Sequence, residues 1–197
     1  GGRPGPELDT DPGMHRFVWD LRYTGPSSAE SGEPEGRGPL ALPGWYGARL
    51  TTGDWSVTRR IQILIDPRVA EDGITQEDLE EQLALGLQVR DAITEARRAA
   101  LLVDSVHTAL ESAAHQDSGG VRSAELEPAR RELAALDSAL VTREGRYQQP
   151  MLLDQLQYLY FNIQGADQRP SGDMEARYEE LAEELHGYLQ TLAANTN

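Results

Sequence analysis

Residues 15–23, with the sequence HRFVWDLRY, decide how the rest of the chain can fold. The large apolar side chains in this stretch fall on alternate positions: Phe17, Trp19, Leu21 and Tyr23. Side chains at alternate positions share one face of a β-strand, so the pattern predicts the first strand of a β-sandwich. A second layer must cover that face. The number of strands that follow therefore decides whether the chain can form a complete sandwich by itself.

Residues 45–50 and 55–65 predict a β-hairpin. Tyr46, Ala48 and Leu50 share one face of its first strand. Gly53-Asp54 lies between the strands and suits a two-residue type II′ turn. In the returning strand, one face carries mainly apolar residues: Val57, Arg59, Ile61, Ile63 and Ile65. We therefore expect a hairpin with one buried side.

The predicted sheet is too small to be a complete sandwich. An immunoglobulin-like sandwich normally has about seven strands in about 100 residues, whereas residues 14–66 supply three convincing ones. Residues 24–39, rich in Gly, Pro, Ser and Glu, predict a long acidic loop that is disordered in a free monomer. We expect a partial immunoglobulin or fibronectin-III-like β-sandwich over residues 14–69. Its missing half must come from upstream sequence, from helices or from another protein.

A long helix is predicted after the hairpin. Thr75-Gln76-Glu77-Asp78 resembles a capping box, in which the Thr hydroxyl accepts from a free backbone N–H and acidic side chains lie at the positive helix end. Apolar and small residues then recur at steps of three and four as far as about His115. This spacing predicts a coiled-coil-like seam on a helix about 60 Å long.

Three shorter helices are predicted behind the long one. Pro128 fits the first turn of one, Pro150 can open the next, and Asp173 can cap the last. Apolar seams of similar period, joined by short turns, favour an antiparallel four-helix bundle over residues 75–197. The long helix would overhang its partners, and the overhang would be exposed unless something packs on it. The fold class we expect is α+β.

The charge balance excludes several kinds of partner. The chain has 33 acidic and 18 basic residues, a formal net charge of −15, and every basic residue is Arg. Nucleic acids and anionic membrane surfaces would be repelled at long range, so a protein partner with a basic face is expected. The absence of Cys excludes disulfides, thiolate ligands and Cys nucleophiles. The chain begins Gly1-Gly2-Arg3-Pro4-Gly5 without Met, and we expect it to be a piece of a longer product.

No constellation of residues predicts a reaction. The four histidines are scattered and lack the spacing of a zinc site: His15, His107, His115 and His186. Asp20 lacks the paired carboxylate of glycoside chemistry, and a structural role, bonding to Arg22 or to loop amides, is expected. We assign no catalytic residue, no cofactor and no metal.

Three stretches and the helical tail carry a resemblance to a known family. Residues 15–23, residues 42–50 (LPGWYGARL) and residues 65–69 (IDPRV) resemble the C-terminal region of bacterial BNR-repeat proteins, the glycosyl hydrolase-like or sortilin-like propellers. The resemblance implies an exported protein whose propeller lies upstream of these residues. The Asp-box of the propeller repeats is absent here, and Trp45 occupies a position usually held by a small residue or Thr.

The chain is also similar to the periplasmic accessory subunit of a bacterial photosynthetic reaction-centre and light-harvesting complex. This resemblance implies a brace between protein subunits that binds no pigment. We therefore expect a non-enzymatic, periplasmic or otherwise extracytoplasmic subunit that docks on a larger membrane-associated assembly. Its expected partners are other protein subunits, with no nucleic acid, no membrane insertion and no small-molecule substrate.

The contact surfaces we expect are an extended arm at residues 1–13, the acidic loop and the long helix. The candidate partner-binding residues are Arg3, Pro4, Glu33, Glu35, Trp45 and His107. The alternative is a C-terminal accessory domain of a propeller hydrolase or peptidase. Such a domain would bind carbohydrate by stacking sugars on its aromatic residues: Trp19, Trp45, Trp55, Tyr23 and Tyr46.

Overall fold

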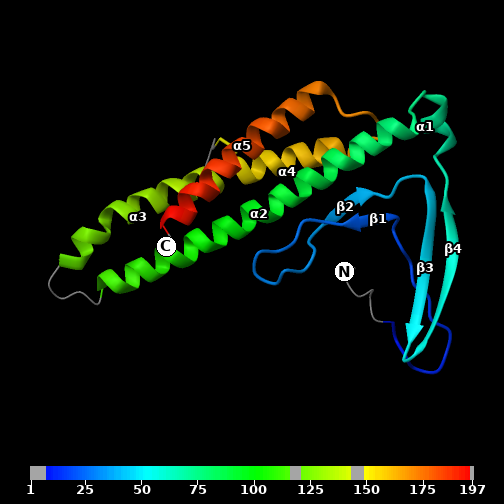
Figure 1. The fold of residues 1–197 in the computed structure, drawn as a ribbon, viewed down its shortest axis with the longest axis horizontal. Coiled ribbons are helices and arrows are strands. Elements are labelled where there is room, and N and C mark those ends of the chain that lie inside the picture. Colours follow the sequence, from blue (N-terminus) through cyan, green and yellow to red (C-terminus); the bar gives the residue numbers. More distant parts are fainter. Residues whose placement is uncertain (1–7, 116–120, 143–148, 196–197) are drawn as a thin grey trace.

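The computed structural model describes residues 8–115, 121–142 and 149–195 (Figure 1). Over these residues the chain is a mixed α/β protein with two small antiparallel sheets and five helices, one of them long. The strands are β1 (Arg22–Thr24), β2 (Arg37–Leu40), β3 (Gly44–Thr52) and β4 (Trp55–Ile63). The helices are α1 (Pro67–Glu71), α2 (Gln76–His115), α3 (Val121–Leu140), α4 (Leu152–Ile163) and α5 (Gly172–Asn195). Arg3 and Pro4 lie outside the described residues.

The first predicted strand is wrong over most of its length, because β1 begins only at Arg22. Leu21 has a φ of 59°, a left-handed conformation that interrupts an extended strand. The Asp20 carboxylate accepts a hydrogen bond from the Arg22 amide at 3.1 Å, and the Trp19 indole donates to the Arg22 carbonyl at 3.0 Å. These bonds stabilise the break and confirm the structural role expected of Asp20.

The predicted hairpin is confirmed. Strands β3 and β4 pair from Gly44 opposite Ile63 to Thr52 opposite Trp55, which leaves a two-residue turn. Gly53 opens that turn with a φ of 52°, a value that Gly adopts without strain. The expectation of a buried side is wrong, because every residue of β3 and β4 is at least partly exposed.

The two sheets are separate ribbons. Strand β1 pairs with β2, and β3 pairs with β4; within the described residues the two pairs are not joined into one sheet. Figure 1 shows the β3–β4 hairpin projecting away from the helices, with residues 9–20 running beside it. This arrangement does not establish the sandwich that the sequence predicts.

The start of the long helix is confirmed in atomic detail. The Asp78 amide donates to the Thr75 hydroxyl at 3.2 Å, and the Thr75 amide donates to the Asp78 carboxylate at 2.8 Å. This reciprocal pair satisfies two backbone donors at the helix start. The later helix starts are less accurate: α3 begins at Val121 with Pro128 inside it, and α4 begins two residues after Pro150.

Helices α2, α3, α4 and α5 share one apolar core. Its fully buried side chains include Ile93 and Val103 from α2, Leu133 from α3, Leu156 from α4 and Leu181 from α5. Figure 1 shows α3 and α4 following one another along α2, with α5 returning beside them. The distal half of α2 therefore packs against α3, so another helix of the chain covers the predicted overhang. A bundle of four helices side by side is not established.

Candidate docking surface and groove

The acidic loop is held against α2. The Ser27 amide donates to the Thr94 hydroxyl at 3.0 Å, and Arg97 donates to the Ser27 carbonyl at 3.2 Å. Arg97 also forms an ion pair of 3.1 Å with Glu35. The expected disorder of this loop is therefore wrong. The charge of Glu35 is balanced from within the chain, whereas Glu33 is exposed.

The other two predicted partner-binding residues lie far apart. Trp45 is 59% exposed, and the Arg60 guanidinium lies 4.5 Å above the centre of its ring in a cation–π contact. His107 is half-buried on the distal part of α2, with its imidazole 3.8 Å from the Glu111 carboxylate. Since the hairpin and the distal end of α2 lie at opposite ends of the molecule, these residues form no common site (Figure 1).

The hairpin carries an apolar surface that the sequence prediction assigned to the protein interior. Directly paired residues share a face of an antiparallel ribbon, and Tyr46 pairs with Ile61 while Leu50 pairs with Val57. We call the apolar residues of this surface the apolar hairpin face: Tyr46, Ala48, Leu50, Trp55, Val57 and Ile61. Arg59, which pairs with Ala48, and Thr52, which pairs with Trp55, lie on the same side of the ribbon. The opposite face is mainly polar and carries Trp45: Arg49, Thr51, Ser56, Thr58, Arg60 and Gln62.

The apolar hairpin face is only half covered. Leu50 is 47% exposed, Trp55 is 54% exposed and Ile61 is 42% exposed. Partial cover comes from the preceding segment, in which the Trp19 ring packs edge-on against Tyr46 with 5.4 Å between the ring centres. Phe17 in the same segment is itself exposed. Large apolar side chains therefore remain in contact with solvent along this ribbon.

The charges on the hairpin differ from those of the whole chain. Residues 44–63 contain Arg49, Arg59 and Arg60 but a single acidic residue, Asp54. Within the described residues, none of these three arginines forms an ion pair with a carboxylate. The hairpin is thus a locally basic element of an acidic protein.

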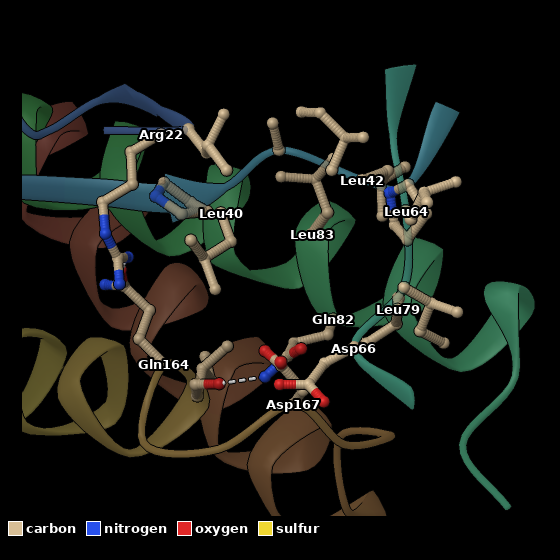
Figure 2. Close-up of a pocket in the computed structure, with 17 residues that line it drawn as sticks. Arg22, Leu40, Leu42, Leu64, Asp66, Leu79, Gln82, Leu83, Gln164 and Asp167 are labelled. Carbon is tan, nitrogen blue, oxygen red and sulfur yellow. Dashed lines mark hydrogen bonds between the residues drawn. The ribbon is translucent and has the colours of Figure 1, made fainter. Parts of the chain in front are cut away.

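A groove of about 190 Å³ lies where the hairpin meets the rest of the molecule. It is bounded by the β1–β2 sheet, the base of the hairpin, the first turns of α2 and the end of α4 (Figure 2). The three stretches that carry the family resemblance meet here. Leu21 and Arg22 come from the first, Leu42 and Pro43 from the second, and Asp66 from the third. This convergence has no local signal in the sequence, since it joins residues more than 40 positions apart, such as Leu21 and Asp66.

Two charged side chains of the groove have different partners. Arg22 donates through Nη1 to the Gly38 carbonyl at 2.9 Å and to the Gln164 side-chain oxygen at 3.3 Å, and both acceptors are neutral. Asp66 caps α1 and accepts from the Arg68 side chain at 2.6 Å. Hydrogen bonds from the Arg68 side chain and amide lower the pKa of Asp66 to about 2.

A buried tyrosine links the β1–β2 sheet to the helices. Tyr160 on α4 donates its hydroxyl hydrogen to the Arg37 carbonyl at 3.1 Å. Burial is the main cause that raises the pKa of Tyr160 to about 12, because the low-dielectric surroundings disfavour the phenolate. The hydroxyl therefore stays protonated as a donor throughout the neutral range.

The described residues contain no group of three or more His, Cys, Asp or Glu side chains placed to hold a metal ion. A search of the same residues for a helix both long and apolar enough to span a membrane finds none. Comparison of the chain with protein-family models, with curated proteins and with solved structures finds no match in any of the three.

Proposed function

We propose that this chain is a non-enzymatic interaction module that docks on a larger protein assembly through its apolar hairpin face. The observation that carries the proposal is the half-exposed row of Leu50, Trp55 and Ile61 on a projecting ribbon. Exposed apolar side chains that are scattered singly are ordinary, but a contiguous set on one face is typical of an interaction surface.

The stability of a two-stranded ribbon supports docking. An isolated hairpin is marginally stable in water and needs a third strand or a packed layer against its apolar face. Within the described residues, β3 and β4 each pair only with the other, so each has an outer edge with free backbone groups. A partner that covers the apolar hairpin face would supply the layer that a sandwich requires.

The local charge indicates the chemistry of the partner. The net charge of the whole chain favours a basic partner, but Arg59 lies among the residues of the apolar hairpin face, and Arg49 and Arg60 lie on the other face of the same ribbon. Complementary potentials steer association and suppress wrong partners. We therefore propose a partner surface with an apolar strip and a carboxylate placed to meet Arg59.

The cellular setting rests on the family resemblance alone. We propose an extracytoplasmic site of action on a membrane-associated assembly, with the periplasmic face of a photosynthetic reaction-centre and light-harvesting complex as one such assembly. Detection of the native protein in the periplasmic fraction, together with co-purifying membrane-complex subunits, supports this setting. Recovery only with the cytoplasmic fraction contradicts it.

A second candidate is an accessory domain of a propeller hydrolase or peptidase. The convergence of three resembling stretches around one groove favours it, because those stretches then form one structural unit. In that case the partner surface belongs to the propeller of the same polypeptide. The aromatic residues give little support for sugar binding, since Trp45 and Trp55 lie on opposite faces of the hairpin and Arg60 already covers the Trp45 ring.

Site-specific photocrosslinking tests the docking proposal. A photoreactive amino acid is placed at Leu50 or Ile61 on the apolar hairpin face, and at Thr58 or Gln62 on the opposite face as matched controls. After irradiation in the source cells, we expect adducts of one mass from the first pair and none from the second. Equal yields from both faces, or no adduct from either apolar position, would refute docking through this face.

A further inference from the structure

The groove of Figure 2 has the size and lining of a small ligand site. Aliphatic side chains from both sheets and two helices form most of its wall, among them Leu40, Leu42, Leu79, Leu83 and Ile163. Its volume of about 190 Å³ is somewhat larger than the roughly 150 Å³ of an engineered apolar cavity that binds benzene. The space therefore accommodates a ligand of about six to eight non-hydrogen atoms.

One cation borders this apolar space without an acidic partner. Arg22 is half-buried, and both hydrogen bonds of its guanidinium leave from Nη1 to neutral oxygens. Among residues 8–115, 121–142 and 149–195, no carboxylate forms an ion pair with it. A guanidinium at a partly desolvated site is best paired with a carboxylate. In a chain rich in carboxylates, the absence of such a partner for Arg22 among the described residues is therefore unusual.

The acidic side chains of the groove lie away from Arg22. In the view of Figure 2, Asp66 and Asp167 are drawn on one side of the groove and Arg22 on the other, beside Gln164. Asp66 is already paired with Arg68. The carboxylate of Asp167 disfavours an anion at this end of the groove, whereas the guanidinium of Arg22 attracts one at the other end.

We propose that the groove binds a short aliphatic monocarboxylate, with its carboxylate on Arg22 and its hydrocarbon chain against the leucine side chains. The second terminal nitrogen of Arg22, Nη2, supplies the donor for the ligand. The guanidinium at one end of the groove fixes the orientation of the ligand. The apolar wall limits its hydrocarbon chain, unbranched or branched, to about four to six carbons. This site is distinct from the apolar hairpin face, and the proposal does not depend on the docking function.

Nuclear magnetic resonance titration with hexanoate tests the proposal on the full chain. A ligand of this size is expected to bind with a dissociation constant of about 1 mM. Methyl signals of Leu40, Leu42 and Leu83 should shift together, and hexan-1-ol should bind at least about tenfold more weakly. An acetylated peptide with a C-terminal leucine forms a second arm. If this peptide binds more tightly than hexanoate, the natural ligand is the C-terminus of a polypeptide. If the peptide binds more weakly, the natural ligand is a free carboxylic acid.

Variants separate the site from a general apolar surface. Arg22→Met should remove the preference for hexanoate over hexan-1-ol, and Arg22→Lys should retain part of it. Leu83→Phe keeps Arg22 but fills the groove from α2, and it should weaken both ligands at least tenfold. Thermal melting checks that each variant is folded, and Leu83→Phe serves as the test if Arg22→Met does not fold.

The proposal is overturned by any of three results. The first is the absence of methyl shifts at a hexanoate concentration 20-fold above the expected dissociation constant. The second is equal binding of hexanoate and hexan-1-ol, and the third is an unchanged preference for hexanoate over hexan-1-ol in folded Arg22→Met. Shifts confined to residues outside the groove would contradict it as well.

Discussion

Replacing the exposed apolar side chains of the hairpin should abolish docking while leaving the helices intact. The variant carries Leu50→Thr, Trp55→Thr and Ile61→Thr, because Thr is well accommodated in strands and is less apolar. The shared core contains no residue of β3 or β4. We therefore expect the free energy of helix unfolding to change by less than about 1 kcal/mol, a shift in melting temperature of at most about 4 °C.

The loss of affinity can be estimated from the exposure of these side chains. Full burial of a large apolar side chain contributes about 1.5–3 kcal/mol. Leu50, Trp55 and Ile61 are 47%, 54% and 42% exposed in the free chain, so about half of that contribution remains for docking. The three together then supply about 2–4 kcal/mol, which corresponds to about a 30- to 1,000-fold change in dissociation constant.

The assay is isothermal titration calorimetry with the partner identified by photocrosslinking, accompanied by circular dichroism melting of each variant. Ser56→Thr with Gln62→Thr, on the opposite face of the same strands, is the matched control and should bind as the unaltered chain does. The reasoning is refuted if the triple variant binds with unaltered affinity. It also fails if the control loses as much affinity as the triple variant.

Three further predictions concern stability and ionisation. Gly38→Ala should destabilise the protein by about 3 kcal/mol or more in chemical denaturation, because the added methyl group would overlap backbone atoms of β1. In the control variant Gly47→Ala the methyl group makes an ordinary contact only, so the free energy of unfolding should change by less than about 1 kcal/mol. Carbon-detected titration should give Asp66 a pKa of about 2, and this pKa should return toward its usual value in Arg68→Met. The ionised Asp66 stabilises the fold above the pKa of the unfolded chain, and this stabilisation is lost as the pH falls through about 2. An unchanged pKa of Asp66 in Arg68→Met would contradict Arg68 as the cause. Ultraviolet titration should show two phenols ionising near pH 12, Tyr160 and Tyr188, and one of them should be absent in Tyr160→Phe. The contribution of Tyr160 is complete below pH 10 and is lost as the pH rises through about 12. An unchanged number of phenols near pH 12 in Tyr160→Phe would count against its burial.

The locally encoded parts of the fold could be predicted from the sequence. The Gly53-Asp54 turn and the reciprocal bonds of Thr75 and Asp78 depend on residues within a few positions of one another. The break at Leu21 could not be predicted from the alternation of apolar residues. Alternate residues share a face only where the backbone is extended, and the pattern does not show whether it is. Neither Gly nor Pro marks that position, and the break is held by bonds to the Arg22 backbone.

The docking surface and the groove depend on contacts that alternation does not encode. The pattern separated the two faces of the hairpin correctly, but it does not say whether another layer covers the apolar one. The acidic loop was misjudged for a similar reason. Its composition predicts disorder, whereas its hydrogen bonds to Thr94 and Arg97 join residues about 70 positions apart.

Hydrogen exchange of the β3–β4 backbone amides, in the free chain and with the crosslinked partner, tests the docking account most directly. We predict rapid exchange of these amides in the free chain, because few buried apolar contacts hold the ribbon closed. The partner should slow their exchange at least tenfold while the amides of α2 remain unchanged. Protection that appears on the helices and spares the hairpin would contradict the account.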